Sequence, residues 1–290
     1  MKIILTMQYV KLFLLLNFMF FVFGAQSQTK AIRLIVRGDD MGFSHAGNVG
    51  IIKAYKEGIE QSIEVIVPSP WFPEAVRLLE ESPGVDVGIH IVLTSEWDNI
   101  KWRPLTDCKS LTDADGYFYP MIWANKNYPG KNLLAHNWKL ADVEKEWRAQ
   151  IELGIKKIPR LSHISAHMGC TNISDSVYAL SRKLAKEYHI DIEPKEFNVL
   201  ETNYDGAHTT SKEKIASFIS MLNKLEAGNT YLFVDHPAID TPELQAIQHI
   251  GYNSVAADRQ GVTDTWTNKK VKNTIRKKHI QLISYKDLVK

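Results

Sequence analysis

Cysteine is scarce in this sequence. The chain of 290 residues contains two cysteines, Cys108 and Cys170. One pair allows a single disulfide within the chain at most, and an oxidising compartment would permit it. Two buried free thiols are the alternative, and the count alone does not choose between them.

An excess of charge of one sign is also lacking. Lys and Arg together number 35 and Asp and Glu 33, which gives a formal net charge of +2. Lys2 and Lys11 belong to the N-terminal segment described next, and without them the net charge is 2 − 2, about zero. Proteins that hold a phosphate backbone need an excess of Lys and Arg. We therefore expect no nucleic-acid partner.

The N-terminal apolar run is too short to be a typical membrane span. "LFLLLNFMFFVFG" follows Lys2 and Lys11, whereas a spanning helix needs roughly 20 apolar residues. Small residues Ala25 and Ser27 follow it, as a signal-peptidase site requires. Residues 1–27 are therefore predicted to be a signal peptide, and an uncleaved anchor is the alternative. We expect an exported protein, periplasmic or secreted, with no stable membrane insertion after cleavage.

No linker or internal repeat divides the rest of the chain, so residues 28–290 are predicted to form one domain. Strand-like and helix-like segments alternate along it, which predicts an α/β fold with parallel strands. The strand-like segments are residues 31–38, 59–69, 85–94, 160–167, 230–237 and 280–285. We expect an irregular or incomplete (β/α) barrel, with an open doubly wound sheet as the alternative. In either fold the site lies at the carboxyl ends of the strands.

The segment 95–140 interrupts this alternation and is rich in aromatic residues. A long loop beside the carboxyl end of a strand is usually functional. Exposed aromatic faces suit sugar rings, so Trp97 and Trp102 are candidate substrate-binding residues. The alternative is a small core beneath the loop. The aromatic residues of the segment include Trp97, Trp102, Tyr117, Phe118, Tyr119, Trp123, Tyr128 and Trp138.

Carboxylates and imidazoles collect at the ends of the predicted strands. A carboxylate with two imidazoles is a common ligand set of a catalytic zinc ion. A divalent cation would also explain two adjacent acids, because it keeps both ionised. The residues at strand ends are Asp39, Asp40, His90, His163, His167, Asp235 and His236.

Four motifs together resemble those of the YdjC-like carbohydrate deacetylases, the chito-oligosaccharide deacetylase type. They are "RGDDMGFSHAGNVGI", "GIHIVLT", "SHISAHMG" and "DHP". The resemblance covers nearly all of the chain after the leader, and the family is related to the polysaccharide deacetylases. It implies an irregular (β/α) barrel that binds one divalent metal ion through an Asp and two His. It also implies removal of acetyl groups from amino sugars.

The resemblance assigns roles to individual residues. Asp40 matches the metal-binding acid, and Asp39 matches the general base. His90 and His167 match the two metal-binding histidines. His163 matches the first histidine of the family's "THLDSH" motif, so it is expected to lie behind the ligands. The metal is expected to be zinc, with magnesium or another divalent ion as alternatives.

The sequence departs from the family pattern in three regions. "THLDSH" reads "SHISAH" here, so Ser165 stands where the motif has Asp, and a carboxylate that would orient a neighbouring group is missing. "DDFG" reads "DDMG", with Met41 in place of Phe. Arg37 stands where Asn is usual, and strand alternation places it on the same side as Asp39. A cation there would keep Asp39 ionised.

These residues predict the hydrolysis of an acetyl group on a sugar. Asp39 is expected to be the base that activates a metal-bound water. His236 is the candidate acid for the leaving amine, and Asp235 could tune it. An esterase acting on O-acetyl groups is one alternative. A sugar-binding relative without catalysis is another. The oligomeric state stays open.

Overall fold

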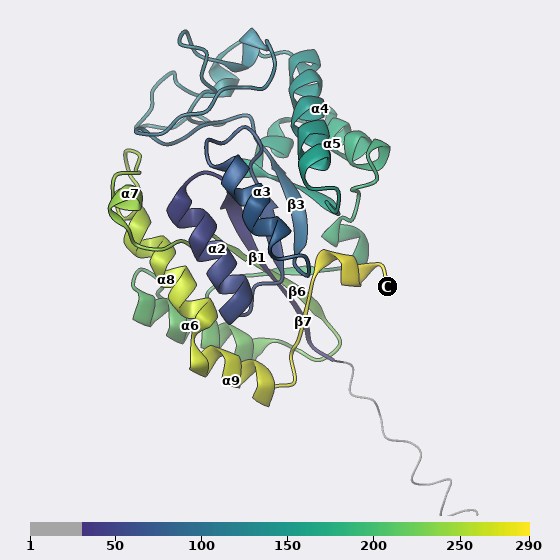
Figure 1. Cartoon of the computed structure of the whole chain (residues 1–290), viewed down its shortest axis with the longest axis vertical. Coiled ribbons are helices and arrows are strands. Elements are labelled where there is room, and N and C mark those ends of the chain that lie inside the picture. Colours follow the sequence, from purple (N-terminus) through teal and green to yellow (C-terminus); the bar gives the residue numbers. More distant parts are fainter. Residues whose placement is uncertain (1–30) are drawn as a thin grey trace, which may run out of the picture.

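The computed structural model of this protein describes residues 31–290. The predicted signal peptide, residues 1–27, lies outside the described residues. The described chain forms one sheet with helices packed around it (Figure 1). Its strands are β1 (Arg33–Met41), β2 (Ser62–Val65), β3 (Asp86–Ile91), β4 (His163–Ala166), β5 (Leu200–Thr202), β6 (Thr230–Asp235) and β7 (Gln281–Ile283).

The sheet is a parallel barrel that stays open on one side. Neighbouring strands follow the order β4-β3-β2-β1-β6-β5, and β7 pairs with the first part of β1. Each of these pairs is parallel. Strands β4 and β5 are the two edges, and residues of both line a cavity of about 210 Å³. The prediction of an incomplete (β/α) barrel is therefore confirmed.

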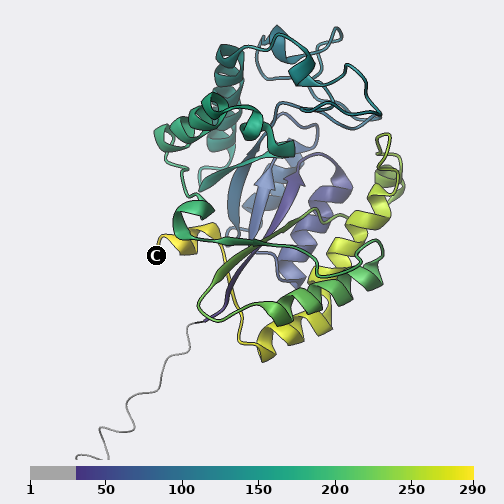
Figure 2. The ribbon, with the colours of Figure 1, turned by 180° about the vertical axis from the view of Figure 1, so that it is seen from behind.

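Helices surround the sheet in two groups. Helices α2 and α3 lie beside β1 to β3, and α4 and α5 pack against each other above them (Figure 1). Helices α6, α8 and α9 form the second group, which Figure 2 shows away from α4 and α5. The α-helices are α2 (His45–Glu57), α3 (Phe72–Glu80), α4 (Leu140–Lys157), α5 (Asp175–Glu187), α6 (Ser211–Lys224), α7 (Pro242–Gln245), α8 (Val255–Thr267) and α9 (Lys269–Lys277).

Strand β1 separates the outer core from the barrel interior. Its alternating side chains point to opposite faces. Leu34 and Val36 pack outward against the group of α6, α8 and α9. Ile35 points inward to a small apolar cluster with Ile283 and Tyr285. Arg37 and Asp39 continue this inward row, so the interior changes from apolar to polar toward the carboxyl end of β1.

Ser44 and Gly58 mark the two ends of helix α2. The Ser44 side chain accepts a hydrogen bond from the Gly47 N–H at 2.9 Å, which caps the first turn. Such a cap typically stabilises a helix by about 1 kcal/mol. Gly58 is the C-cap residue. The cap residue Ser44 lies three residues after Met41, so the cap fixes the turn that follows the two acids.

Helix α8 and strand β5 lack a clear local sequence pattern. Helix α8 reads "VAADRQGVTDTWT", and small or polar residues occupy most of its turns. Arg259 and Thr263 are nevertheless buried, because the helix packs against α2 and α6. Strand β5 has three residues, with Leu200 and Glu201 exposed. Such a strand is too short to show an alternating pattern.

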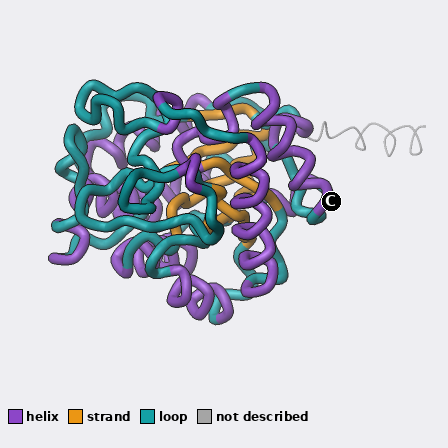
Figure 3. Tube along the Cα trace, turned by 90° about the horizontal axis from the view of Figure 1, so that it is seen from above, coloured by secondary structure: helices purple, strands orange, loops and turns teal. Residues whose placement is uncertain are grey.

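A long connection follows β3 and carries the aromatic residues. Between Ile91 and α4 it contains the short 3₁₀-helices η1 (Lys109–Leu111) and η2 (Leu133–Ala135). Seen from above, loops spread over one half of the molecule and the strands appear in the other half (Figure 3). Further 3₁₀-helices are η3 (His167–Ile173), η4 (Pro194–Phe197) and η5 (Tyr285–Leu288).

Within residues 31–290, no helix combines the length and apolar character that crossing a membrane requires.

The two cysteines are free thiols in the structure. Cys108 and Cys170 are both buried, and the Cys170 thiol donates to the Ile91 carbonyl oxygen. Burial raises the pKa of Cys108 to about 11, so thiolate is scarce at neutral pH. We expect a thiol reagent such as Ellman's reagent to modify neither cysteine in the native protein and both after denaturation. One fast-reacting thiol before denaturation, or none afterwards, would contradict this arrangement.

Candidate active site

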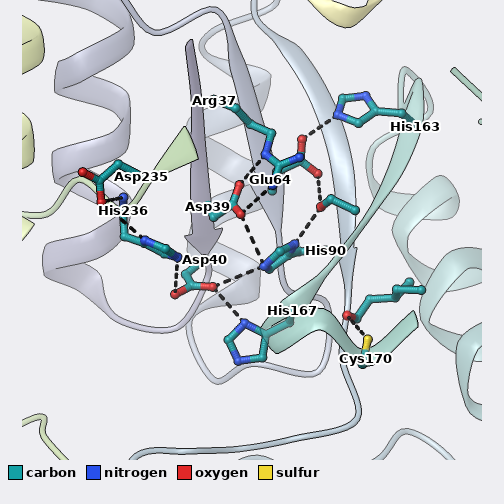
Figure 4. A network of polar contacts seen from close by, with 12 residues as sticks. Arg37, Asp39, Asp40, Glu64, His90, His163, His167, Cys170, Asp235 and His236 are labelled. Carbon is teal, nitrogen blue, oxygen red and sulfur yellow. Dashed lines mark hydrogen bonds and ion pairs between the residues drawn. The ribbon is translucent and has the colours of Figure 1, made fainter. Parts of the chain in front are cut away.

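Strands β1, β3, β4 and β6 bring the predicted residues to one end of the barrel, and Figure 4 shows their side chains together. Strand β1 carries Asp39 and Asp40 near its end, and β3 carries His90. His167 follows β4, and His236 follows β6. The strands are parallel, so their carboxyl ends meet at the same edge. The structure therefore brings these five side chains into one cluster.

Asp40, His90 and His167 form a candidate metal site. Each offers one ligand atom, and the three atoms lie within 4.8 Å of one another. His167 Nδ1 lies 3.1 Å and His90 Nε2 lies 3.5 Å from Asp40 Oδ1. All three residues are buried, and Asp40 Oδ1 forms no hydrogen bond. A buried oxygen without a partner beside two imidazoles fits a divalent cation.

A break in β1 lets both acids face this site. In a regular strand, Asp39 and Asp40 would point to opposite faces. Asp40 instead has φ of 71°, in the left-handed region that residues other than glycine rarely adopt. The pairing of β1 with β2 shifts between Gly38 and Met41. As a result His90 Nε2 lies 3.7 Å from Asp39 Oδ2 and 3.5 Å from Asp40 Oδ1.

Arg259 of α8 holds the second oxygen of Asp40. Its Nη2 donates to Asp40 Oδ2 at 2.8 Å, and both residues are buried. Burial alone would raise the pKa of Asp40, but the neighbouring imidazoles and Arg259 hold it well below its usual range. The guanidinium also lies 4.6 Å from the ring centre of Phe43 and 5.2 Å from that of Trp97. Asp40 is thus ionised, with Oδ1 left facing the histidines.

Asp39 has a different partner. Arg37 Nε donates to Asp39 Oδ1 at 2.7 Å and Arg37 Nη2 to Asp39 Oδ2 at 2.9 Å. The proximity that strand alternation predicts is present in the structure. Arg37 Nη1 also donates to the Tyr285 hydroxyl at 2.7 Å, which fixes the guanidinium in place. The two adjacent acids therefore have separate partners and separate environments.

Glu96 lies behind His167. His167 Nε2 is 2.9 Å from Glu96 Oε2, so Nδ1 is the nitrogen that faces Asp40. Burial lowers the pKa of His167, but the carboxylates of Glu96 and Asp40 outweigh it and raise the pKa to about 10. Glu96 is buried in the loop after β3. A metal-binding histidine commonly has such a carboxylate behind it.

His236 lies on the opposite side of Asp40 and is more open to solvent. Its Nε2 is 3.7 Å from Asp40 Oδ2, and its Nδ1 is 3.6 Å from Asp235 Oδ1. Its side chain is 38% exposed, whereas that of Asp40 is 2% exposed. Tyr204 donates a hydrogen bond of 2.8 Å to Asp235 Oδ2, which holds this carboxylate in place. His236 can therefore reach both the cluster and the solvent.

His163 is not part of the candidate metal site. Its Nε2 lies 2.5 Å from Glu64 Oε1, and its Nδ1 lies 2.7 Å from Ser162 Oγ. The ring stacks on Tyr285 with centroids 3.6 Å apart. Glu64 also contacts the hydroxyl of Ser165. The carboxylate whose absence the "SHISAH" motif suggests is therefore supplied by β2, from a position that the sequence analysis missed.

Trp97 and Trp102 do not present exposed faces. Their relative exposures are 2% and 3%, and both belong to the main core cluster. The Trp102 indole N–H donates to the Thr94 carbonyl oxygen at 2.9 Å. Trp97 packs against Phe43 and beneath Arg259. The prediction of exposed stacking surfaces is wrong, because the loop folds over its own aromatic residues and both tryptophans join the main core.

A polar cavity opens beside Asp235. Its volume is about 430 Å³, and Tyr204 and Tyr252 are its aromatic residues. Lys214 also lines it, and the ammonium forms an ion pair of 2.9 Å with Asp258. The other lining residues are Asn203, His208, Thr209, Val234 and Ser254. The cavity is therefore lined by Asp235, the carboxylate that contacts His236 Nδ1.

Three residues of the site were not among the residues predicted from the sequence. Arg259 lies on a helix without a predictive pattern, 219 positions from Asp40. Glu96 lies in the aromatic loop, where no motif marks it. Glu64 is different, because an acidic residue within the apolar segment "SIEVIV" is itself a signal. A charged residue is rarely buried without a partner, so the sequence alone indicates that Glu64 has a specific partner.

Comparisons with known proteins agree with the motifs. A carbohydrate deacetylase of Clostridium beijerinckii is 32% identical over 270 residues, with 89% of this chain and 100% of the relative covered. Carbohydrate deacetylase 1 of Listeria innocua is 26% identical over 266 residues, with the same coverage of 89% and 100%.

A solved structure from Enterococcus faecalis, described as a candidate cellobiose-phosphate cleavage protein, has the same fold. It superposes with a TM-score of 0.68 at 24% identity, with 89% of this chain and 99% of that chain covered. A family model for YdjC-like proteins matches residues 33–277, a range that contains every strand carrying the cluster. The chain therefore belongs to the YdjC-like family.

Proposed function

We propose that this protein is a metal-dependent hydrolase that removes acetyl groups from N-acetylated sugars or oligosaccharides. The observation that carries the proposal is the division between the two adjacent acids. Asp40 faces two histidines. Asp39 lies beside them and accepts a hydrogen bond from Arg37. The arrangement offers ligands and a separate base. The carbohydrate deacetylases among its relatives support this reaction class.

Asp40, His90 and His167 would hold one divalent ion, and zinc suits this donor set. Such an ion, when bound, supplies a Lewis acid for the amide carbonyl and lowers the pKa of water toward about 7. Asp39 takes the proton from the attacking water. Arg37 places a cation beside Asp39 and holds its carboxylate in one orientation through two hydrogen bonds.

His236 gives a proton to the leaving amine. It stands across Asp40 from His167, and 38% of its side chain is exposed, so a substrate can reach it. Asp235 and Tyr204 hold the imidazole from behind. A base on one side of the scissile bond and an acid on the other is the arrangement that amide hydrolysis requires.

The sugar occupies the cavity beside Asp235. Tyr204 and Tyr252 offer aromatic surface, and the remaining wall is mostly polar. This composition suits a saccharide, whose rings have apolar faces and hydroxyl edges. These residues replace Trp97 and Trp102 as candidates for substrate binding.

Asn203→Ala tests this cavity. Asn203 is exposed in its wall and forms no side-chain hydrogen bond among the described residues, so a sugar hydroxyl can pair with it. One lost hydrogen bond typically costs about 0.5–1.5 kcal/mol, so KM should rise roughly 2- to 12-fold while kcat changes little. Asn223→Ala on the exposed side of α6 is the matched control. Equal KM values in both variants would place the sugar elsewhere.

The reaction is tested by measuring its two products together. A panel of acetylated saccharides should yield acetate and free amine in equal amounts. Acetate without free amine would instead indicate an O-acetyl esterase. Binding of metal and saccharide without acetate release would indicate a sugar-binding relative without catalysis, even though Asp39 and the three candidate metal ligands are present.

Export is a separate part of the proposal and rests on the N-terminal sequence alone. N-terminal sequencing of the protein from cells should find a mature chain that begins at Gln28. A chain that retains its first residues in the membrane fraction would indicate the uncleaved anchor.

A further inference from the structure

A buried carboxylate from another strand stands behind His90. Glu64 of β2 is fully buried, and its Oε2 accepts a hydrogen bond from the hydroxyl of Ser165. Ser165 Oγ lies 2.6 Å from His90 Nδ1. Glu64 therefore reaches His90 through one hydroxyl group, and the three residues form a hydrogen-bonded row. Figure 4 labels Glu64 and His90, the two ends of this row.

Strand register builds this row. Glu64 on β2 pairs with Gly88 on β3, and Gly88 pairs with His163 on β4. Two residues further along, His90 pairs with Ser165. Gly88 leaves the space between β2 and β4 open, since a Cβ there would clash with Glu64 Oε2 and His163 Nε2. The carboxylate can thus cross the face of β3 and meet the side chains of β4.

Hydrogen-bond chemistry gives this row a direction. A carboxylate accepts hydrogen bonds and does not donate them, and burial is outweighed by His163 and Arg37, which lower the pKa of Glu64 to about 2. Ser165 must therefore donate its hydroxyl proton to Glu64. Its oxygen then accepts from His90, so Nδ1 of His90 carries the proton. His90 Nε2 is left with its lone pair facing Asp40.

We propose that Glu64 is a positioning residue that, through Ser165, fixes the tautomer and orientation of His90 and thereby sets the metal affinity of the site. The inference rests on the metal site of the proposed function. It differs from that proposal in what it predicts, because it concerns binding of the ion and the tautomer of His90 rather than turnover. Outer carboxylates of this kind typically change metal affinity by roughly 10- to 100-fold.

Two variants break the row at different points. Glu64→Gln leaves one acceptor oxygen for the two neighbours Ser165 and His163 and puts an NH2 donor in place of the other oxygen. Ser165→Ala removes the link while leaving the contact between Glu64 and His163. Both should weaken zinc binding roughly 10- to 100-fold in calorimetry. Glu60→Gln is the matched control, because Glu60 is equally buried and has no hydrogen-bond partner. Nitrogen NMR of the metal-free protein should show Nδ1-protonated His90 in the wild type and a mixture of tautomers in both variants.

A rescue separates positioning from a general loss of structure. Ser165→Asp in the Glu64→Gln background places a carboxylate directly beside His90 Nδ1 and should recover most of the affinity. Ser165→Asp alone sets a second carboxylate against Glu64 and should lower the thermal stability of the metal-free protein.

Three results would overturn the inference: an unchanged zinc affinity in Ser165→Ala, an unchanged His90 tautomer in both variants, or a double variant no better than Glu64→Gln. A wild-type protein that binds no divalent ion would overturn it together with the proposed function. Zinc affinities that fall in the two variants as predicted, without acetate release by the wild type, would support the inference and contradict only the proposed reaction.

Discussion

Asp39→Asn is expected to retain the metal ion and lose roughly 10²- to 10⁴-fold in kcat, the typical contribution of a general base. The asparagine keeps the shape of the side chain and one oxygen for Arg37, so the local structure should persist. It cannot take up a proton at neutral pH. Calorimetry with zinc and acetate release under saturating substrate measure the two effects separately.

Asp115→Asn, an exposed acid in the aromatic loop, is the control for this variant and should change neither quantity. Loss of zinc from Asp39→Asn to the same extent as from a ligand variant would contradict the separate roles of the two acids. A kcat within threefold of the wild type would show that another group is the base.

Asp40→Ala is expected to abolish both metal binding and activity and to lower the stability of the metal-free protein. Removing Asp40 leaves Arg259 buried without its anion, and two of the guanidinium nitrogens already have no partner. Breaking a buried ion pair from one side typically costs about 3–5 kcal/mol. Chemical denaturation of the metal-free variant measures this cost, and calorimetry measures the loss of zinc.

The double variant Asp40→Ala/Arg259→Met separates the two consequences. Replacing both partners of a buried pair is often nearly neutral, and Met can fill the space over Phe43 and Trp97. Stability should therefore return while zinc binding stays absent. Zinc binding at wild-type affinity in the double variant would show that Asp40 is not a ligand. No recovery of stability would show that the ion pair is not the source of the loss.

Residues at strand ends were the part of the site that sequence could predict. Asp39, Asp40, His90 and His167 each follow or end a segment with a strand pattern, and parallel strands align such positions at one edge. The incomplete barrel follows from the same alternation of strands and helices. These inferences need only local patterns and one general rule of topology.

The partners of these residues depend on contacts that no local pattern shows. Arg259 reaches Asp40 from a helix whose burial comes from packing on α2 and α6 rather than from an apolar stripe. Glu64 reaches Ser165 because Gly88 leaves room across an intervening strand. The prediction of an exposed face for Trp97 was wrong, because aromatic content alone does not distinguish a binding surface from a core. Each case was decided by tertiary packing.

Acetate release from an N-acetylated saccharide, followed while a divalent ion is returned to the chelated protein, tests whether hydrolysis depends on a single metal ion. We expect no release from the chelated protein and a rise that saturates at one ion per chain. Free amine should appear in equal amount at every point. Full activity of the chelated protein, or saturation only beyond one ion per chain, would contradict it.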